Sequence, residues 1–147
     1  MEQVFDIFSR ISGGRALDRI RYILVNNERR VNPKSSQEEL NGIFAGQQKT
    51  LILYPHAFDP VSHRVPGVSN LAGTLIHELS HGLTDEVFND WRERFGWKYL
   101  DRPVEVSPGV WRSYDPPANG KFVTAYAEVD PGEDIVESMV AALVRPD

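Results

Sequence analysis

The stretch His77-Glu78-Leu79-Ser80-His81 places two histidines four residues apart, with a glutamate directly after the first. Because an α-helix turns about 100° per residue, both imidazoles would project from one face of a helix, one turn apart. Two imidazoles in this arrangement can bind one Zn²⁺, and Glu78 would lie at the flank, beside a metal-bound water. The stretch therefore predicts a helix that binds zinc.

The residues around this motif fit one amphipathic helix that begins at Ser69 or Asn70 and ends near Gly82. Serine and asparagine are preferred N-caps, so either residue can start the helix. His77 and His81 lie on the polar face, opposite a single apolar stripe. The stripe consists of Leu71, Ala72, Leu75, Ile76, Leu79 and Leu83. We expect the stripe to be buried and the histidines to face a cleft.

A catalytic zinc site needs a third protein ligand and an open position for water. The chain contains no cysteine, and His56 and His63 both precede the motif in a proline-containing stretch. We therefore expect a carboxylate from further along the chain. Asp130-Pro131 has the pattern of an N-cap followed by the first residue of a helix, which would run to about Val144.

Two glutamates, Glu133 and Glu137, share one face of this second predicted helix. One can bind the metal, and the other can accept a hydrogen bond from a metal-bound histidine. Glu133 has another interpretation, because Asp130-x-x-Glu133 is also a capping box in which its carboxylate bonds the backbone N–H of Asp130. We expect the ligand role, because no other candidate ligand is as well placed.

The combination of H-E-x-x-H with a later Glu-x-x-x-Glu helix resembles the gluzincin class of zinc metallopeptidases. The spacing of Tyr126, Glu133 and Glu137 is similar to that in its lethal-factor-like and Pro-Pro endopeptidase-like branch. This resemblance covers about residues 69–85 and 122–144. It implies that His77, His81 and Glu133 bind one catalytic Zn²⁺, with Glu78 as general base, Tyr126 as oxyanion donor and Glu137 as support for a zinc-bound histidine.

The resemblance implies a zinc-dependent endopeptidase with a compact zincin-like domain. Three alternatives remain open: a non-catalytic zinc-binding or protein-interaction module, a hydrolase of a non-peptide bond, and an aspzincin-type peptidase. In the aspzincin alternative Asp85 or Asp90 would be the third ligand. The Gly-Thr-x-Asp-x-x-Tyr pattern of aspzincins is absent from the chain, which argues against that alternative.

Length and composition describe an ordinary globular chain. Its 147 residues predict one domain, 1–147, and 41% hydrophobic with 25% charged residues is typical of such domains. The net charge of −5 argues against a nucleic-acid partner. With no signal peptide, no membrane-spanning run and no cysteine, we expect a cytoplasmic monomer that acts on a peptide or protein, while leaderless export remains open.

The remaining pattern predicts a mixed α+β fold. β-branched and aromatic residues indicate strands at 43–45 and 49–54, joined by residues 46–48 with hairpin-like spacing. Residues 16–26 begin with a helical pattern and pass into a strand. The 49–54 strand either lies at the edge of the cleft, where a peptide can add as a further strand, or is an ordinary buried strand.

The other predicted elements are helices at 2–11 and 86–95 and a polar loop at 26–36. Residues 101–121 are rich in proline and predict an irregular segment with short strands near 104–106 and Trp111. This segment is a candidate wall of the cleft. Trp111 and Tyr114 would then be either substrate contacts or core aromatics.

Overall fold

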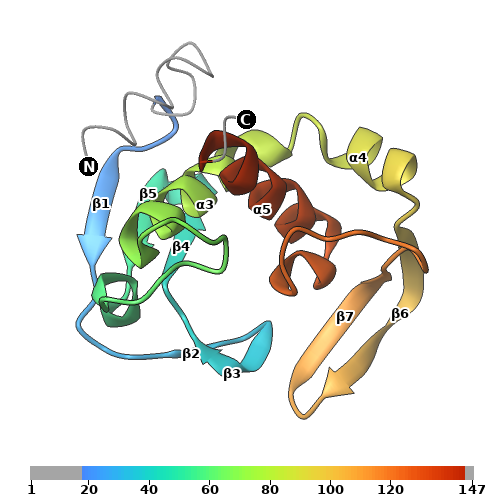
Figure 1. Ribbon diagram of the computed structural model, residues 1–147, viewed down its shortest axis with the longest axis horizontal. Coiled ribbons are helices and arrows are strands. Elements are labelled where there is room, and N and C mark those ends of the chain that lie inside the picture. Colours follow the sequence, from blue (N-terminus) through green and yellow to red (C-terminus); the bar gives the residue numbers. More distant parts are fainter. Residues whose placement is uncertain (1–17, 145–147) are drawn as a thin grey trace.

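A long helix, α3 (Asn70–Thr84), lies between a small sheet and a second helix, α5 (Pro131–Val144) (Figure 1). The computed structural model describes residues 18–144, which form a small α+β fold. Both helices begin where the capping residues predict. Ser69 Oγ accepts a hydrogen bond from the backbone N–H of Ala72 at 3.3 Å, and Asp130 caps the start of α5. The helix expected at residues 2–11 lies outside the described residues.

The main sheet has three strands in the order β1 (Tyr22–Val25), β5 (Thr50–Leu53) and β4 (Gly42–Ala45). β5 pairs in parallel with β1 and antiparallel with β4, which confirms the predicted β4–β5 hairpin and the strand at the end of 16–26. Because β5 has hydrogen-bonded neighbours on both sides, it has no free edge for a peptide. Of the two alternatives for this strand, the structure therefore shows the ordinary buried strand, and β1 and β4 are the edge strands of the sheet.

The hydrophobic core lies where α3 packs against the sheet and α5. Leu75 and Leu79 are each 1% exposed, and they contact Leu51 of β5 and Val140 of α5 in one buried cluster. Burying a leucine side chain contributes about 2 kcal/mol, so these contacts fix the position of α3. The polar face of the helix is thereby directed to the opposite side.

The predicted polar loop at 26–36 contains one short strand and the start of a second instead. β2 (Val31–Asn32) and β3 (Ser35–Glu39) form an antiparallel ribbon with a tight turn between them. In this turn Asn32 Oδ1 accepts a hydrogen bond from the backbone N–H of Lys34 at 2.9 Å. These strands could not be predicted from the polar composition, because their pairing depends on this local turn and not on an apolar face.

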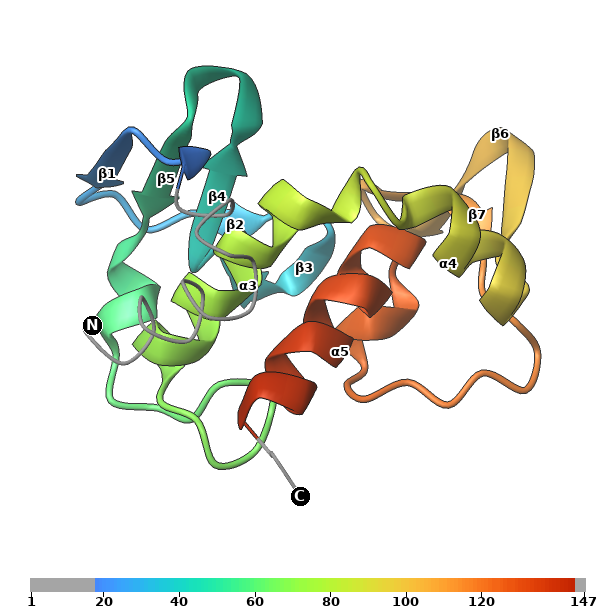
Figure 2. The ribbon, with the colours of Figure 1, turned by 90° about the horizontal axis from the view of Figure 1, so that it is seen from above.

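The proline-rich segment is also more regular than predicted. β6 (Lys98–Ser107) and β7 (Val110–Asp115) form a hairpin that projects beyond the short helix α4 (Phe88–Phe95) (Figure 2). Gly109 has a φ of +77°, a left-handed conformation that suits glycine at the turn of the hairpin. In the described part of the chain, no helix is long and apolar enough to cross a membrane.

Candidate metal centre

The polar face of α3 presents the two histidines of the motif. The ring centroids of His77 and His81 are 4.9 Å apart, as expected for positions one turn apart on a helix. His77 is buried and His81 is half-buried. The helix therefore has one deeply placed imidazole and one that is more open to the cleft.

The first turn of α5 brings Glu133 to these rings. Glu133 Oε2 lies 3.1 Å from His77 Nε2 and 3.6 Å from His81 Nε2. The capping function belongs to Asp130, whose Oδ1 accepts the backbone N–H groups of Gly132 and Glu133 at 2.8 and 3.0 Å. The Glu133 side chain is thus directed to the histidines, and the capping-box interpretation of its carboxylate is wrong.

These three side chains fit a small divalent cation. Glu133 Oε2 is buried and makes no hydrogen bond, although burying such an oxygen without a partner is costly. Tetrahedral zinc with ligand distances of 2.0–2.1 Å would place neighbouring donor atoms about 3.3 Å apart. The distances from Glu133 Oε2 to the two ring nitrogens agree with this spacing. Together with their mutual proximity, this makes His77, His81 and Glu133 a candidate metal-ligand group.

The second glutamate of α5 contacts the other nitrogen of the buried histidine. Glu137 Oε1 lies 2.8 Å from His77 Nδ1, and Glu137 Oε2 accepts a hydrogen bond from Thr124 Oγ1 at 2.8 Å. Glu137 is fully buried, so this contact is not shared with solvent. With the Nδ1 proton donated to Glu137, the lone pair of His77 Nε2 is free to bind a metal.

The local charges favour a cation beside His77. Burial lowers the pKa of this ring, but its contacts with Glu133 and Glu137 and the charge of Glu78 outweigh burial and raise the pKa to about 10. Burial also raises the pKa of Glu133, yet the contacts with His77, His81 and Lys34 prevail and hold it well below its usual range. The buried carboxylate of Glu133 therefore stays ionised and attracts positive charge.

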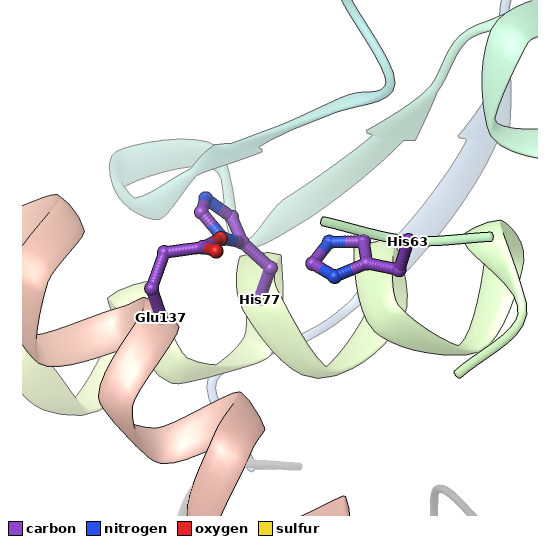
Figure 3. Close-up of side chains that lie close together, drawn as sticks. All are labelled: His63, His77 and Glu137. Atoms are coloured by element: carbon purple, nitrogen blue, oxygen red, sulfur yellow. The ribbon is translucent and has the colours of Figure 1, made fainter. Parts of the chain in front are cut away.

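His63 lies beside His77, and the centroids of the two rings are 6.4 Å apart (Figure 3). It forms a second candidate metal group with His77 and Glu137. Glu137 is already hydrogen bonded to His77 Nδ1, and His63 Nδ1 accepts the backbone N–H of Val65 at 3.2 Å. Burial lowers the pKa of His63 to about 4, so its ring is neutral. His63 Nε2 is buried without a hydrogen bond, so this ring packs beside His77 with one nitrogen unpaired among the described residues.

Gly73 makes room for the His63 ring on α3, which leads to a testable prediction. A Cβ atom at position 73 would lie 2.2 Å from His63 Cγ, too close for the ring to stay in place. We expect Gly73→Ala to lower the free energy of unfolding by about 1–3 kcal/mol, measured by urea denaturation. Gly82→Ala on the same helix is the control, because its Cβ would meet nothing closer than 3.4 Å. Equal stability of the two variants would contradict the packing of His63 against α3.

Glu78 follows His77 on the flank of α3 and is also buried. It lies against the edge strand, since a Cβ added to Gly42 would come within 2.9 Å of Glu78 Cγ. Burial raises the pKa of this carboxyl, while the charges of His77 and His81 oppose the increase. A carboxylate with a raised pKa beside a candidate metal centre is the type of group that can exchange a proton with a bound water.

Tyr126 belongs to a single helical turn, η3 (Tyr126–Glu128), that precedes α5. Its ring centroid is 6.0 Å from that of His77, and Arg64 Cζ lies 3.9 Å from the centroid on its face. The Tyr126 hydroxyl accepts a hydrogen bond from Asn32 Nδ2 at 3.1 Å. The tyrosine is thus held beside the histidines by contacts from two loops.

An open cleft of about 830 Å³ adjoins this group. The predicted site residues that line it are His77, Glu78, His81, Tyr126 and Glu133. Residues of β4 and of the turn between β2 and β3 also line the cleft. The cleft therefore gives a solvent-accessible path to the ligand group.

Other predicted residues do not join the group. Asp85 lines the cleft and is exposed, and Asp90 is exposed on α4, but neither is part of a candidate metal group among the described residues. Trp111 is 60% exposed on the β6–β7 hairpin, outside the lining of the cleft. Tyr114 packs against Phe88 and Tyr99. None of residues 101–121 lines the cleft, so this segment does not form the wall for which it was a candidate.

The sequence analysis missed the supporting residues from the loops. Asn32 and Lys34 come from the unexpected β2–β3 turn, and Arg64 and Thr124 contact Glu137 from two further loops. The Asn32-Pro33 pair signals a turn, but no local pattern predicts which distant group a turn will contact.

Comparison with protein-family models, with curated proteins and with solved structures gives no match. The chemistry of the site is therefore argued from the arrangement of its own side chains. The chain is characterised by two histidines of α3 and one glutamate of α5 that converge on a single point beside an open cleft.

Proposed function

We propose that the protein is a zinc-dependent endopeptidase of gluzincin type, in which His77, His81 and Glu133 bind the metal. One observation carries this proposal: Glu133 Oε2 is buried without a hydrogen bond at 3.1 and 3.6 Å from the Nε2 atoms of the two histidines. Two imidazoles and a carboxylate with an accessible fourth position are the ligand set of a catalytic zinc.

The balance of charge supports a divalent cation. The carboxylates of the group are Glu78, Asp130, Glu133 and Glu137. Two cations of the described residues contact them: Lys34 pairs with Glu133 and Asp130, and Arg64 lies 3.8 Å from Glu137. With all four carboxylates ionised and both imidazoles neutral, as metal ligands must be, the negative charges exceed these cations by two, and a doubly charged ion would balance them.

The side chains have distinct roles in peptide hydrolysis by this proposal. Bound Zn²⁺ would supply Lewis acidity, which lowers the pKa of water and polarises the scissile carbonyl. Glu78 takes a proton from the attacking water and later gives it to the amine nitrogen as the C–N bond breaks. Tyr126 donates a hydrogen bond from its hydroxyl to the oxyanion that develops on the carbonyl oxygen. Glu137 keeps the His77 ring in the tautomer that exposes Nε2.

The cleft suits an extended peptide as substrate. Its wall includes the edge strand β4, whose residues Gly42, Ile43 and Phe44 are part of the lining. An edge strand has unpaired backbone groups that can bond a peptide as an additional strand. The short distance between Gly42 and Glu78 would bring such a peptide close to the general base.

The test is a metal analysis combined with a peptide-library cleavage assay on the purified chain. We expect about one zinc per chain and cleavage that a chelator abolishes and added Zn²⁺ restores. Zinc binding without cleavage of any library would favour the non-catalytic module. A folded chain with no affinity for zinc would contradict both functions.

A further inference from the structure

The turn between β2 and β3 lines the cleft beside the candidate metal site. Asn32 is only 4% exposed, and its side chain links the turn to Tyr126 while also accepting the backbone N–H of Lys34. Both residues line the cleft. The contacts of Asn32 therefore hold the turn in place, and Lys34, two residues later, extends towards α5.

Lys34 forms ion pairs with the first turn of α5. Its Nζ atom lies 2.6 Å from Glu133 Oε1 and 2.8 Å from Asp130 Oδ2. The Lys34 side chain is 42% exposed, whereas that of Glu133 is 3% exposed. This is not an ordinary surface ion pair, because its carboxylate partner is buried inside the candidate ligand group.

The two oxygens of Glu133 have different partners. Oε1 binds the ammonium of Lys34, while Oε2 lies near the two histidine nitrogens without a hydrogen bond. A carboxylate with both oxygens free can bind a metal through both and thereby fill an additional coordination position. A catalytic site has to keep a position open for water.

We propose that Lys34 is a positioning residue that makes Glu133 a one-oxygen ligand by holding Oε1 away from the metal. This inference rests on the proposed metal site, although it does not depend on which bond the enzyme cleaves. Asp130 assists, because it binds the same ammonium and also caps the helix that carries Glu133. The turn and the cap together fix the orientation of the carboxylate.

A purely structural ion pair and a positioning residue make different predictions for metal binding. Loss of a structural contact would loosen Glu133 and weaken the binding of the metal. Loss of a positioning contact frees Oε1 for the metal and removes a nearby positive charge, so binding should be at least as tight. The metal would then have one more ligand, and that ligand would fill the coordination position that a catalytic site keeps open for water.

The test uses Co²⁺ in place of zinc, because its visible absorption weakens several-fold when coordination rises from four to five or six ligands. We expect Lys34→Met to bind Co²⁺ at least as tightly as the natural chain, with a several-fold weaker visible band. Lys34→Arg should restore the original spectrum, since a guanidinium can also donate to Oε1. Lys49→Met is the matched control, because Lys49 lines the same cleft and pairs with no described carboxylate.

Two results would overturn the inference in distinguishable ways. A chain that binds no cobalt would contradict the metal site itself, and the role of Lys34 with it. A chain that binds cobalt with the same spectrum before and after Lys34→Met would contradict the role of Lys34 alone. Weaker binding in both Lys34→Met and Lys34→Arg would show a structural contact instead of a positioning one.

Discussion

Glu78→Gln is expected to lower kcat/KM by about 10²–10⁴-fold while the metal stays bound. Glutamine has nearly the shape of glutamate, so the packing against Gly42 is kept. It cannot take a proton from water, and the reaction loses its general base. The measurement is kcat/KM on a peptide selected from the library, together with the metal content of the variant.

Asp85→Asn provides the matched control for this experiment. Asp85 is an exposed carboxylate that lines the same cleft but lies outside the candidate ligand group. We expect this variant to keep both its metal and its activity. If Glu78→Gln cleaved the peptide as fast as the natural chain, Glu78 would not be the base.

Glu133→Gln is expected to weaken metal binding on the order of 10³-fold or more, because it removes a charged ligand and not merely an outer contact. Glu137→Gln should have a smaller effect of about 10–100-fold, the range typical of groups that orient a ligand histidine. Both dissociation constants can be measured by competition with a chromogenic chelator. The difference follows from the positions of the two glutamates on the Nε2 and Nδ1 sides of His77.

Circular dichroism of each metal-free variant separates these effects from misfolding. Glu133 and Glu137 are both buried, so either replacement changes a polar contact in the interior. If Glu133→Gln kept its metal while Asp85→Asn or Asp90→Asn lost it, the third ligand would be an aspartate. Equal losses in the two glutamine variants would contradict the separate roles proposed for them.

The two helices of the site could be predicted because their signals are local. The Ser69 cap and the Asp130-Pro131 pair lie within one turn of the helix starts that they determine. The apolar stripe of α3 predicted which face is buried, and Leu75 and Leu79 are in the core. Helix periodicity and capping involve neighbours in sequence, so they can be read without the fold.

Strands outside the main sheet were harder to predict. β2 and β3 lie in a polar stretch, and β6 contains Pro103 within a segment that reads as irregular. Each of these strands belongs to a two-stranded ribbon whose regularity depends on its partner across a turn. Strand formation of this kind depends on cross-strand contacts more than on intrinsic preference.

The sequence by itself determined the half of the site that lies on one helix: two imidazoles on a common face, with Glu78 at their flank. Helical periodicity alone is sufficient for that arrangement. Only the tertiary structure decided that Glu133 meets the histidines, that Glu137 contacts one of them and that Lys34 contacts the other oxygen of Glu133. These contacts join distant parts of the chain, and they arise because the shared core of α3, α5 and the sheet fixes the positions of the helices and strands.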